Sequence, residues 1–345
     1  MYKRLNLLAS FAYLRDDPFY VDLLLALAPF ANILIDSGAH TNYQLRLAAA
    51  AGKPTRAREV LLQDYVDFCL KIDGKVWQYI ALDVIRNKAA TDKNLDAMLV
   101  AGLRPMPVYI EGHDASDLAR ILAVNPRICV AGAVAASDTY IRRRYAEILN
   151  LSGGVAKIHG LGYGRFPGTF KAAFASCDSS SFNYGSRYGV IYLYNRQTGF
   201  MAFPWHAMAD NRPDDPIRRS KYIDALSDMF DLSAEQLSNP LLYKGKDAQI
   251  SLPLLAGSVA YLDFMQHVRE WGKDYFIAAP TAGFIFTLIA LVAAQGTEGG
   301  YRYETVKGFY QKIDGARKQS NADCISLCAH ILEEATLWQP MPHSL

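Results

Sequence analysis

Short apolar runs alternate with amphipathic stretches through residues 1–205. The runs end on polar or glycine-containing tips and are NLLASFAY, ANILIDSGAH, WQYIALDVI, MPVYIEGHD, ICVAGAV, AKIHGLGYG, FASCDSSS and GVIYLYN. Helical patterns between them cover residues 56–72, 93–101, 115–124 and 137–149. Because apolar strands that alternate with helices are typical of a parallel sheet covered on both faces, the pattern predicts an α/β fold. Seven or eight such units favour a TIM-like (β/α)8 barrel over residues 1–205.

The alternative fold is a doubly wound open sheet, but no GxGxxG or GxxxxGK[ST] motif follows the first strand. After residue 205 the pattern changes to a loop rich in proline and charge, followed by a mainly helical pattern. The helices are expected over residues 217–230, 233–238, 252–271 and 303–338. Ser233 and Gln236 have the spacing of a capping box. We expect residues 206–345 to form a helical extension packed on the barrel.

The composition of the 345-residue chain is that of an ordinary globular protein, and its net charge of +2 indicates little about partners. Its five cysteines are scattered and odd in number, which favours a reducing cytoplasm over a disulfide framework. Residues 276–294 carry no charge and are nearly long enough to span a bilayer. Pro280 and Gly283 interrupt them, so we interpret this segment as a buried helix or helix pair and expect a cytoplasmic protein without membrane association.

Acidic residues end several of the predicted strands, namely Asp36, Asp83, Glu111 and Asp178. In a barrel the carboxyl ends of all strands face one mouth, so these side chains are expected to converge there. Converging carboxylates repel one another, which raises pKa values and suits nucleophilic and acid–base roles. Each acid alone is also explained as a solvated group or a cap, and Asp178 as a turn formed with its own serines.

Two histidines, His113 and His159, also lie near predicted strand ends. A lone histidine in such a place is usually a satisfied structural residue, and contact with a substrate or phosphate is the alternative. Tyr163 and Phe182 near the mouth would either stack on a base or pack in the core.

In order along the chain, the strand ends resemble motifs of the tRNA-guanine transglycosylase superfamily. ILIDSGAH resembles its DSGGFQ strand end, ALDV its LDE, VYIEG its VQGG, CVAGAV its GGL and IHGLGYGRF its MGVG strand. CDSSSFNYGSRYG resembles its DCVMPTRxARxG segment, with Arg187 nine residues and Gly189 eleven residues after Asp178. The resemblance covers residues 30–190 and is greatest to the DNA 7-deazaguanine transglycosylases of phages and bacterial genomic islands, the DpdA-like proteins.

The resemblance implies a pentosyltransferase that replaces guanine in DNA with a 7-deazaguanine, such as preQ0 or a derivative, through a covalent aspartyl-nucleotide intermediate. It implies that Asp178 is the nucleophile and that Asp36 is the second catalytic aspartate, a general acid/base or positioning group. Asp83 matches the carboxylate that accepts the N–H groups of the base.

The remaining matches concern substrate binding. Ser37 and Gly38 belong to the DSGA strand end, and Gly132 matches a backbone contact to the base. Glu111 stands where the family usually has glutamine, so while ionised it could accept but not donate a hydrogen bond. Arg187 matches an arginine that holds a phosphate or orders the loop.

The metal-binding run of the tRNA enzymes, CxCxxC with a later histidine, is missing from this chain. CISLCAH places Cys324, Cys328 and His330 close together, but this stretch has the pattern of an amphipathic helix. We therefore expect no zinc and no other cofactor. The free 7-deazaguanine base is the expected co-substrate.

DNA is the expected macromolecular partner, with tRNA as the alternative, and a helper protein is left open. Basic clusters at residues 142–144, 218–221 and 244–246 are candidate phosphate contacts or solvated faces. A base can reach a barrel mouth only from a single strand or after flipping out of a duplex.

Three further hypotheses remain beside DNA base exchange. They are the same exchange on tRNA, as in a queuosine-type tRNA-ribosyltransferase; another barrel enzyme; and a non-enzymatic nucleic-acid binder or membrane-associated lobe. A glycosidase would use two of the carboxylates, and a Schiff-base lyase would need a lysine such as Lys157. The sequence sets no oligomeric state.

Overall fold

The computed structural model describes residues 4–55, 57–132, 136–179, 181, 185, 188–204, 216–239, 241–244 and 250–337. The chain forms two compact units. The first, here called the sheet unit, comprises residues 6–179 and 268–280. The second, the helical unit, comprises residues 1–5, 180–267 and 281–345.

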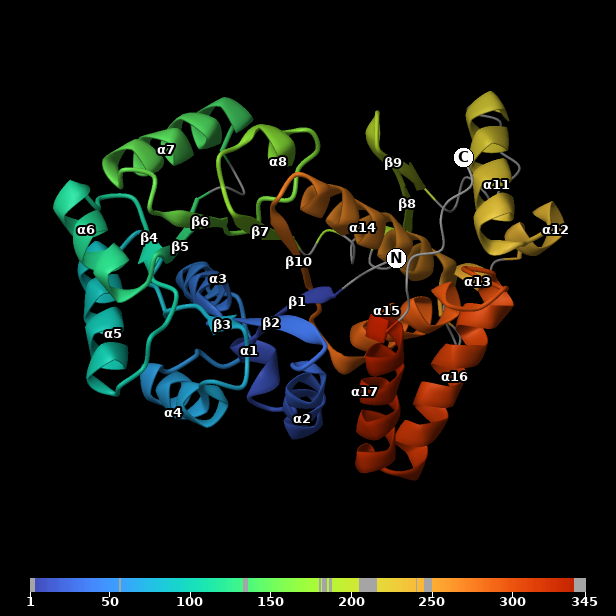
Figure 1. Cartoon of the computed structure of the whole chain (residues 1–345), viewed down its shortest axis with the longest axis horizontal. Helices are drawn as coiled ribbons and strands as arrows, with labels where there is room; N and C mark the ends of the chain where they lie inside the picture. Colours follow the sequence, from blue (N-terminus) through green and yellow to red (C-terminus); the bar gives the residue numbers. More distant parts are fainter. Residues whose placement is uncertain are drawn as a thin grey trace. The chain divides into compact units, whose positions relative to one another are not determined.

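The sheet unit is built on a strongly curled, parallel, eight-stranded sheet (Figure 1). Its strands are β1 (Leu5–Ser10), β2 (Ala31–Asp36), β3 (Gln78–Tyr79), β4 (Val108–Tyr109), β5 (Arg127–Val130), β6 (Lys157–Gly160), β7 (Ser176–Ser179) and β10 (Asp274–Ala278). Their order is β3-β2-β1-β10-β7-β6-β5-β4. Beside the two outer strands, Ile80 and Met106 form a parallel bridge, in which Met106 N–H donates to Tyr79 O (2.8 Å) and Ala81 N–H to Met106 O (2.9 Å).

Helices interleave with these strands, as the alternating pattern predicts. They are α1 (Phe11–Leu14), α2 (Pro18–Leu27), α3 (Ala39–Ala50), α4 (Leu62–Ile72), α5 (Lys88–Val100), α6 (Ala115–Val124), α7 (Asp138–Leu151) and α8 (Gly168–Lys171). α4 shows how they attach: Tyr65, Val66, Cys69 and Ile72 form its buried face. The Tyr65 hydroxyl donates to the backbone carbonyl of Ile80 (2.6 Å), which ties the helix to the end of β3.

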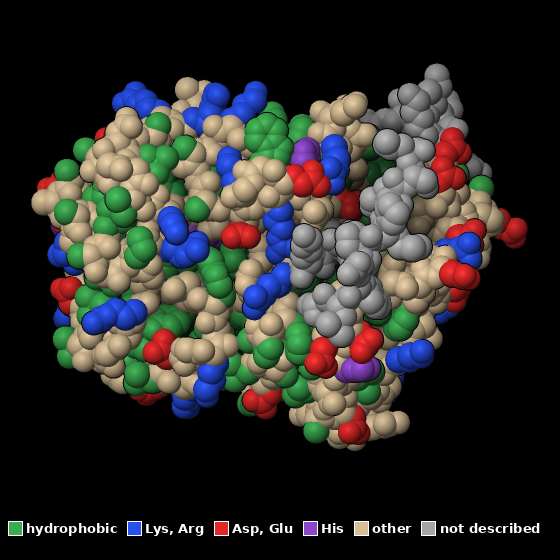
Figure 2. Space-filling model, in the orientation of Figure 1, with side chains coloured by type: hydrophobic (Ala, Val, Ile, Leu, Met, Phe, Trp, Pro, Cys, Tyr) green, Lys and Arg blue, Asp and Glu red, His purple; other side chains and the backbone are tan. Residues whose placement is uncertain are grey.

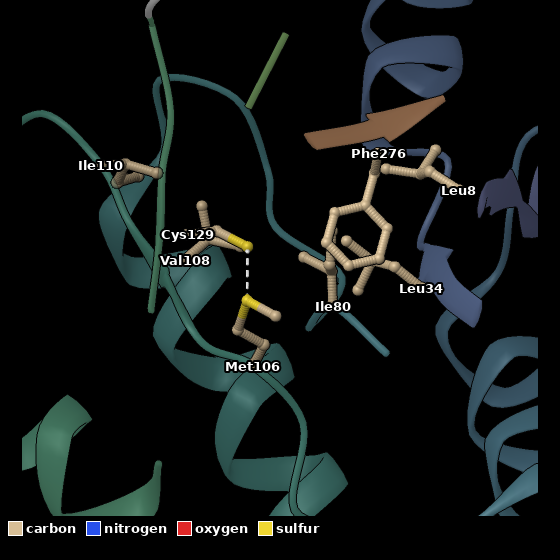
Figure 3. Close-up of a cluster of buried hydrophobic side chains, with 8 residues drawn as sticks. All are labelled: Leu8, Leu34, Ile80, Met106, Val108, Ile110, Cys129 and Phe276. Carbon is tan, nitrogen blue, oxygen red and sulfur yellow. Dashed lines mark hydrogen bonds between the residues drawn. The ribbon is translucent and has the colours of Figure 1, made fainter. Parts of the chain in front are cut away.

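The core of the sheet unit is a cluster of side chains from strands far apart in the sheet order (Figure 3). Its members are Leu8, Leu34, Ile80, Met106, Val108, Ile110, Cys129 and Phe276. A flat sheet could not bring β1, β2, β4, β5 and β10 to one cluster, so these residues mark the concave face of the curl. The Cys129 thiol lies 3.3 Å from the Met106 sulfur within it.

The helical unit contains a separate antiparallel hairpin of β8 (Val190–Asn195) and β9 (Gly199–Pro204). Its helices are α11 (Pro216–Phe230), α12 (Ala234–Leu237), α13 (Leu241–Lys244), α14 (Leu252–Glu270, which continues into the sheet unit at Val268), α15 (Ala282–Gln295), α16 (Tyr303–Gln319) and α17 (Asn321–Leu337). Phe200 of the hairpin stacks on Tyr261 of α14, with ring centroids 4.5 Å apart. The predicted capping box of Ser233 and Gln236 is confirmed at the start of α12.

Three expected elements differ in the structure. GVIYLYN forms β8 of the hairpin and does not join the parallel sheet. The eighth parallel strand is β10, which lies beyond the predicted boundary at residue 205. The uncharged segment 276–294 is therefore not a helix or helix pair: it begins as a strand and continues as α15 only after Pro280. No helix among the described residues has both the length and the apolar character needed to cross a membrane.

Candidate active site

The register of the sheet turns His159, Ser176 and Asp178 toward the concave face. Asp178 of β7 pairs with Phe276 of β10, and His159 of β6 pairs with both Cys129 of β5 and Ser176 of β7. Paired residues point to the same face of a sheet, and so do residues two apart on a strand. Since Phe276 and Cys129 belong to the core cluster, the three polar side chains lie on the inner face, with Ser176 at the amino end of β7 and Asp178 near its carboxyl end.

The Asp178 carboxylate is held on one of its two oxygens. Gly162 N–H donates to Oδ1 at 2.8 Å, and His159 Nε2 lies 3.2 Å from the same oxygen. On its other side, His159 Nδ1 lies 2.9 Å from the Ser176 hydroxyl oxygen. Asp178 is 9% exposed, His159 0% and Ser176 2%. Among the described residues, Oδ2 of Asp178 has no hydrogen-bond partner, so this oxygen remains available to a substrate.

Asp36 and Asp83 approach the same centre from β2 and from the turn after β3. Burial and, secondarily, the negative charge of Asp178 raise the pKa of Asp36, although hydrogen bonds from the Ser10 hydroxyl and Gly38 N–H (3.0 Å) oppose this rise. Burial and then the charge of Asp36 raise the pKa of Asp83 to about 7. Electrostatic repulsion thus acts between Asp178 and Asp36 and between Asp36 and Asp83.

The pKa of the buried Cys129 thiol depends on the same three acids. Burial is the main reason why its pKa lies well above the ordinary value, and the charges of Asp178, Asp83 and Asp36 each raise it further. One buried group therefore lies within electrostatic range of all three acids. Three of the four acids that were expected to converge, Asp36, Asp83 and Asp178, thus act electrostatically on the same buried thiol, and Glu111 does not.

Ser37 and Gly38 form the junction between β2 and α3. Gly38 has φ +87°, a conformation that favours glycine. A Cβ here would lie 3.0 Å from the Ala12 Cβ and 3.1 Å from a Val60 methyl, so this junction has no room for a larger residue. The Ser37 hydroxyl is fully buried and has no hydrogen-bond partner among the described residues.

The remaining predicted site residues are not held at this centre by described contacts. Glu111 lies exposed on the loop after β4. Gly132, at the end of β5, has φ +92°, with open space where a side chain would stand. Arg187 and Phe182 lie outside the described residues.

From the sequence, His159 is either a structural residue or a substrate contact, and no pattern assigns Ser176 or Ser10 to the site. The contact of His159 with Asp178 depends on the register between β6 and β7, which no local pattern encodes. The alternation Ser-Cys-Asp at residues 176–178 could have indicated that Ser176 belongs to the site, because it places Ser176 and Asp178 on one face of a strand.

His113 has the structural role that is usual for a buried histidine. Its Nδ1 accepts a hydrogen bond from Ile110 N–H (3.1 Å), and its Nε2 lies 3.1 Å from Asp92 Oδ1. Tyr109 additionally donates its hydroxyl to the His113 carbonyl (2.9 Å). These bonds fix the turn after β4.

A cavity of about 330 Å³ adjoins Asp83. Tyr43 and Arg46 of α3, Asn94 of α5 and Val60 also line it. Its volume lies at the lower end of the range of small-ligand sites. A buried acid on the wall of a polar cavity suits recognition of N–H donors.

Lysine and metal chemistry receive no support from the described residues. Lys157 is exposed at the amino end of β6, opposite the acids. Lys273 donates to the backbone carbonyls of Thr169, Phe170 and Ala172, which gives it a structural role. No group of three or more metal-binding side chains comes together in the described part of the chain.

The basic clusters are only partly described. Arg142 and Arg143 are exposed on α7, whereas Arg144 lies over the ring of Tyr109 at 4.9 Å. The other clusters, residues 218–221 and 244–246, have side chains outside the described part. In Figure 2, Lys and Arg side chains are interspersed with acidic ones over the visible face.

No protein-family model matches the chain, and a search of curated proteins finds none that matches it in sequence. The fold and the chemistry of the acidic centre are therefore the features from which a function can be inferred.

Proposed function

We propose that this chain is a base-exchange transglycosylase that replaces guanine in DNA with a 7-deazaguanine, preQ0 or a derivative. The observation that carries the proposal is that Asp36, Asp83 and Asp178 follow or end strands of one curled parallel sheet and act on one another electrostatically. The proposal includes a closed (β/α)8 barrel, and the bridge between Ile80 and Met106 supports such closure.

In the first step, Asp178 Oδ2 attacks C1′ of the target nucleotide. The bond from C1′ to N9 breaks, its electron pair leaves with guanine, and the carboxyl group of Asp36 protonates the departing base. The product is an ester between Asp178 and C1′ with the sugar-phosphate chain intact. Two observations support these roles: Oδ1 of Asp178 is already occupied by Gly162 and His159, and the raised pKa of Asp36 favours a carried proton.

In the second step, the incoming 7-deazaguanine gives its N9 proton to the Asp36 carboxylate, and N9 attacks C1′. Asp178 leaves as a carboxylate, so two inversions give net retention. Asp83 in its ionised form accepts the N–H groups of the base. Its burial beside the 330 Å³ cavity and its pKa of about 7 support this role.

The test is nucleoside mass spectrometry after incubation of the purified protein with preQ0 and either single-stranded DNA, duplex DNA or tRNA. We expect deazaguanine in DNA and free guanine in equal amounts, and neither product with Asp178→Ala. Incorporation only into tRNA would show that the substrate is tRNA and would contradict the proposed exchange in DNA. Release of free base without incorporation would instead indicate a glycosidase.

The covalent intermediate gives a second, independent test. An end-labelled oligonucleotide that has lost guanine at the target C1′ should remain attached to the protein under denaturing conditions when preQ0 is withheld. Asp178→Ala should abolish the attached species. Full exchange without any dependence on Asp178 would overturn the assigned chemistry.

A further inference from the structure

We propose that His159, held by Ser176, is a positioning residue that donates a hydrogen bond from Nε2 to Oδ1 of Asp178 and thereby selects Oδ2 as the attacking oxygen. This inference depends on the proposed function, because it assigns the orientation of the nucleophile in that reaction.

We assign the direction of each hydrogen bond from the chemistry of the partners of the ring. A carboxylate oxygen only accepts, so His159 Nε2 at 3.2 Å carries the proton that it shares with Asp178 Oδ1. In the neutral tautomer with its proton on Nε2, which the proposal assigns, Nδ1 carries a lone pair, and the Ser176 hydroxyl at 2.9 Å donates to it. The ring also packs edge-on against Phe276, with centroids 5.9 Å apart. Packing and both bonds hold the imidazole in one orientation.

Asp178 depends on this donor more than a surface acid would. Among the described residues, its carboxylate accepts only from Gly162 N–H and His159, and both bonds end on Oδ1. Loss of the imidazole would leave a buried acid with one donor and would free the carboxyl group to rotate. Either oxygen would then face the substrate, and attack would lose its fixed geometry.

The hydrogen bond from His159 Nε2 also stabilises the negative charge that Asp178 loses and regains during base exchange. When Oδ2 forms the ester with C1′, Oδ1 becomes a carbonyl oxygen. When the incoming base displaces Asp178, negative charge returns to the carboxylate and the Nε2–H donor stabilises it. Removal of the donor should therefore slow displacement more than ester formation, and the covalent intermediate should accumulate.

The chain contains a matched control in His113. This histidine is also buried, and its Nε2 lies 3.1 Å from Asp92. Asp92, however, has further partners in Lys88 (3.1 Å) and Arg120. The variants His159→Gln and His113→Gln thus make the same chemical change at two histidine–aspartate contacts, only one of which belongs to the acidic centre.

The experiment measures exchange kinetics of the full chain with preQ0 and DNA. We expect His159→Ala to lower kcat about 10- to 100-fold with KM for DNA changed less than about twofold, and to raise the trapped covalent fraction. His159→Gln, which keeps an N–H donor near the position of Nε2, should recover part of the loss. His113→Gln should keep wild-type kcat at temperatures where it is folded.

Nitrogen-15 NMR of the imidazole in the substrate-free protein supplies a readout independent of activity. We expect the proton on Nε2 of His159 in the wild type and mixed tautomers in Ser176→Ala. A proton on Nδ1 alone, or His159→Ala kinetics that match His113→Gln, would overturn the positioning role. If the wild type performs no base exchange but the NMR result holds, the proposed function fails while the described orientation of Asp178 stands.

Discussion

Asp83 is a buried acid whose ionisation opposes folding. Its pKa rises from the ordinary 3.8 to about 7, chiefly through burial. Between these values the unfolded chain loses the proton while the native chain keeps it, so the free energy of unfolding should fall as pH rises from about 4 to 7. At about 1.4 kcal/mol per pH unit, the total loss is at most about 4 kcal/mol, and it stays constant at higher pH.

Asp83→Asn should remove this pH dependence. Urea denaturation at pH 4.5, 6 and 8 should show a variant that gains stability relative to wild type as pH rises. Glu111→Gln is the control, because Glu111 is exposed and its replacement should leave the pH profile unchanged. A constant difference between Asp83→Asn and wild type across this range would contradict the raised pKa.

Gly164 provides a steric test of the loop that holds Asp178. It lies two residues after Gly162, and a Cβ there would meet the Ser179 Cβ at 2.7 Å and Tyr275 at 2.9 Å. Gly164→Ala should therefore displace Ser179, next to Asp178, and cost about 1–3 kcal/mol of stability.

The control for that substitution is Gly315→Ala. Gly315 lies inside α16, and a methyl group added to it would meet no atom within 4 Å outside the backbone of its own helix. Alanine there should raise the free energy of unfolding by about 0.5–1 kcal/mol, because it restricts the unfolded chain. Thermal unfolding of the two variants should thus shift in opposite directions. An unchanged or higher melting temperature for Gly164→Ala would show that the loop adapts.

At the scale of single elements, α6 shows how far local sequence can determine structure. Its bounds, Ala115–Val124, agree with the prediction. Asp114 accepts hydrogen bonds from the N–H groups of Ser116 (2.8 Å) and Asp117 (3.0 Å), and Asp117 accepts from Asp114 N–H (3.0 Å). The start of this helix is fixed by residues within four positions of one another.

Asp114→Ala should lower the free energy of unfolding at neutral pH, because two N–H groups lose their acceptor. The hydrogen bonds lower the pKa of Asp114, so the stabilisation is present above its ordinary pKa and disappears as pH falls through the lowered value. Asp64→Ala, in the first turn of α4, is the control, because no described hydrogen bond depends on that side chain. Equal losses for the two variants would contradict the capping role.

The elements that differed from prediction lack such local determinants. GVIYLYN has the apolar character of a buried strand, but its pairing with residues 199–204 made it a hairpin. In residues 276–294 a short strand and a helix share one uncharged run, so hydropathy alone could not separate them. The positions of Asp36, Asp83 and Asp178 were predictable because parallel strands bring their carboxyl ends together, whereas the contact of His159 required the register.

At the scale of the whole molecule, the sheet is not complete within residues 1–205. β10 lies between β1 and β7, and its Phe276 belongs to the core cluster. A fragment of residues 1–205 would leave β1 and β7 without their shared neighbour and a large void in the core.

We expect the fragment 1–205 to show no cooperative unfolding transition when expressed alone. Co-expression with residues 206–345 should recover a soluble complex with cooperative unfolding, because that fragment supplies β10 to the gap between β1 and β7. A matched complex carrying Phe276→Ala should form more weakly, since it lacks the aromatic ring that fills the core. A cooperative transition and native-like circular dichroism for 1–205 alone would mean that the sheet unit tolerates the loss of an internal strand. In that case β10 would be an addition to an autonomous fold, and the acidic centre beside it would not need Phe276 to orient Asp178 and His159.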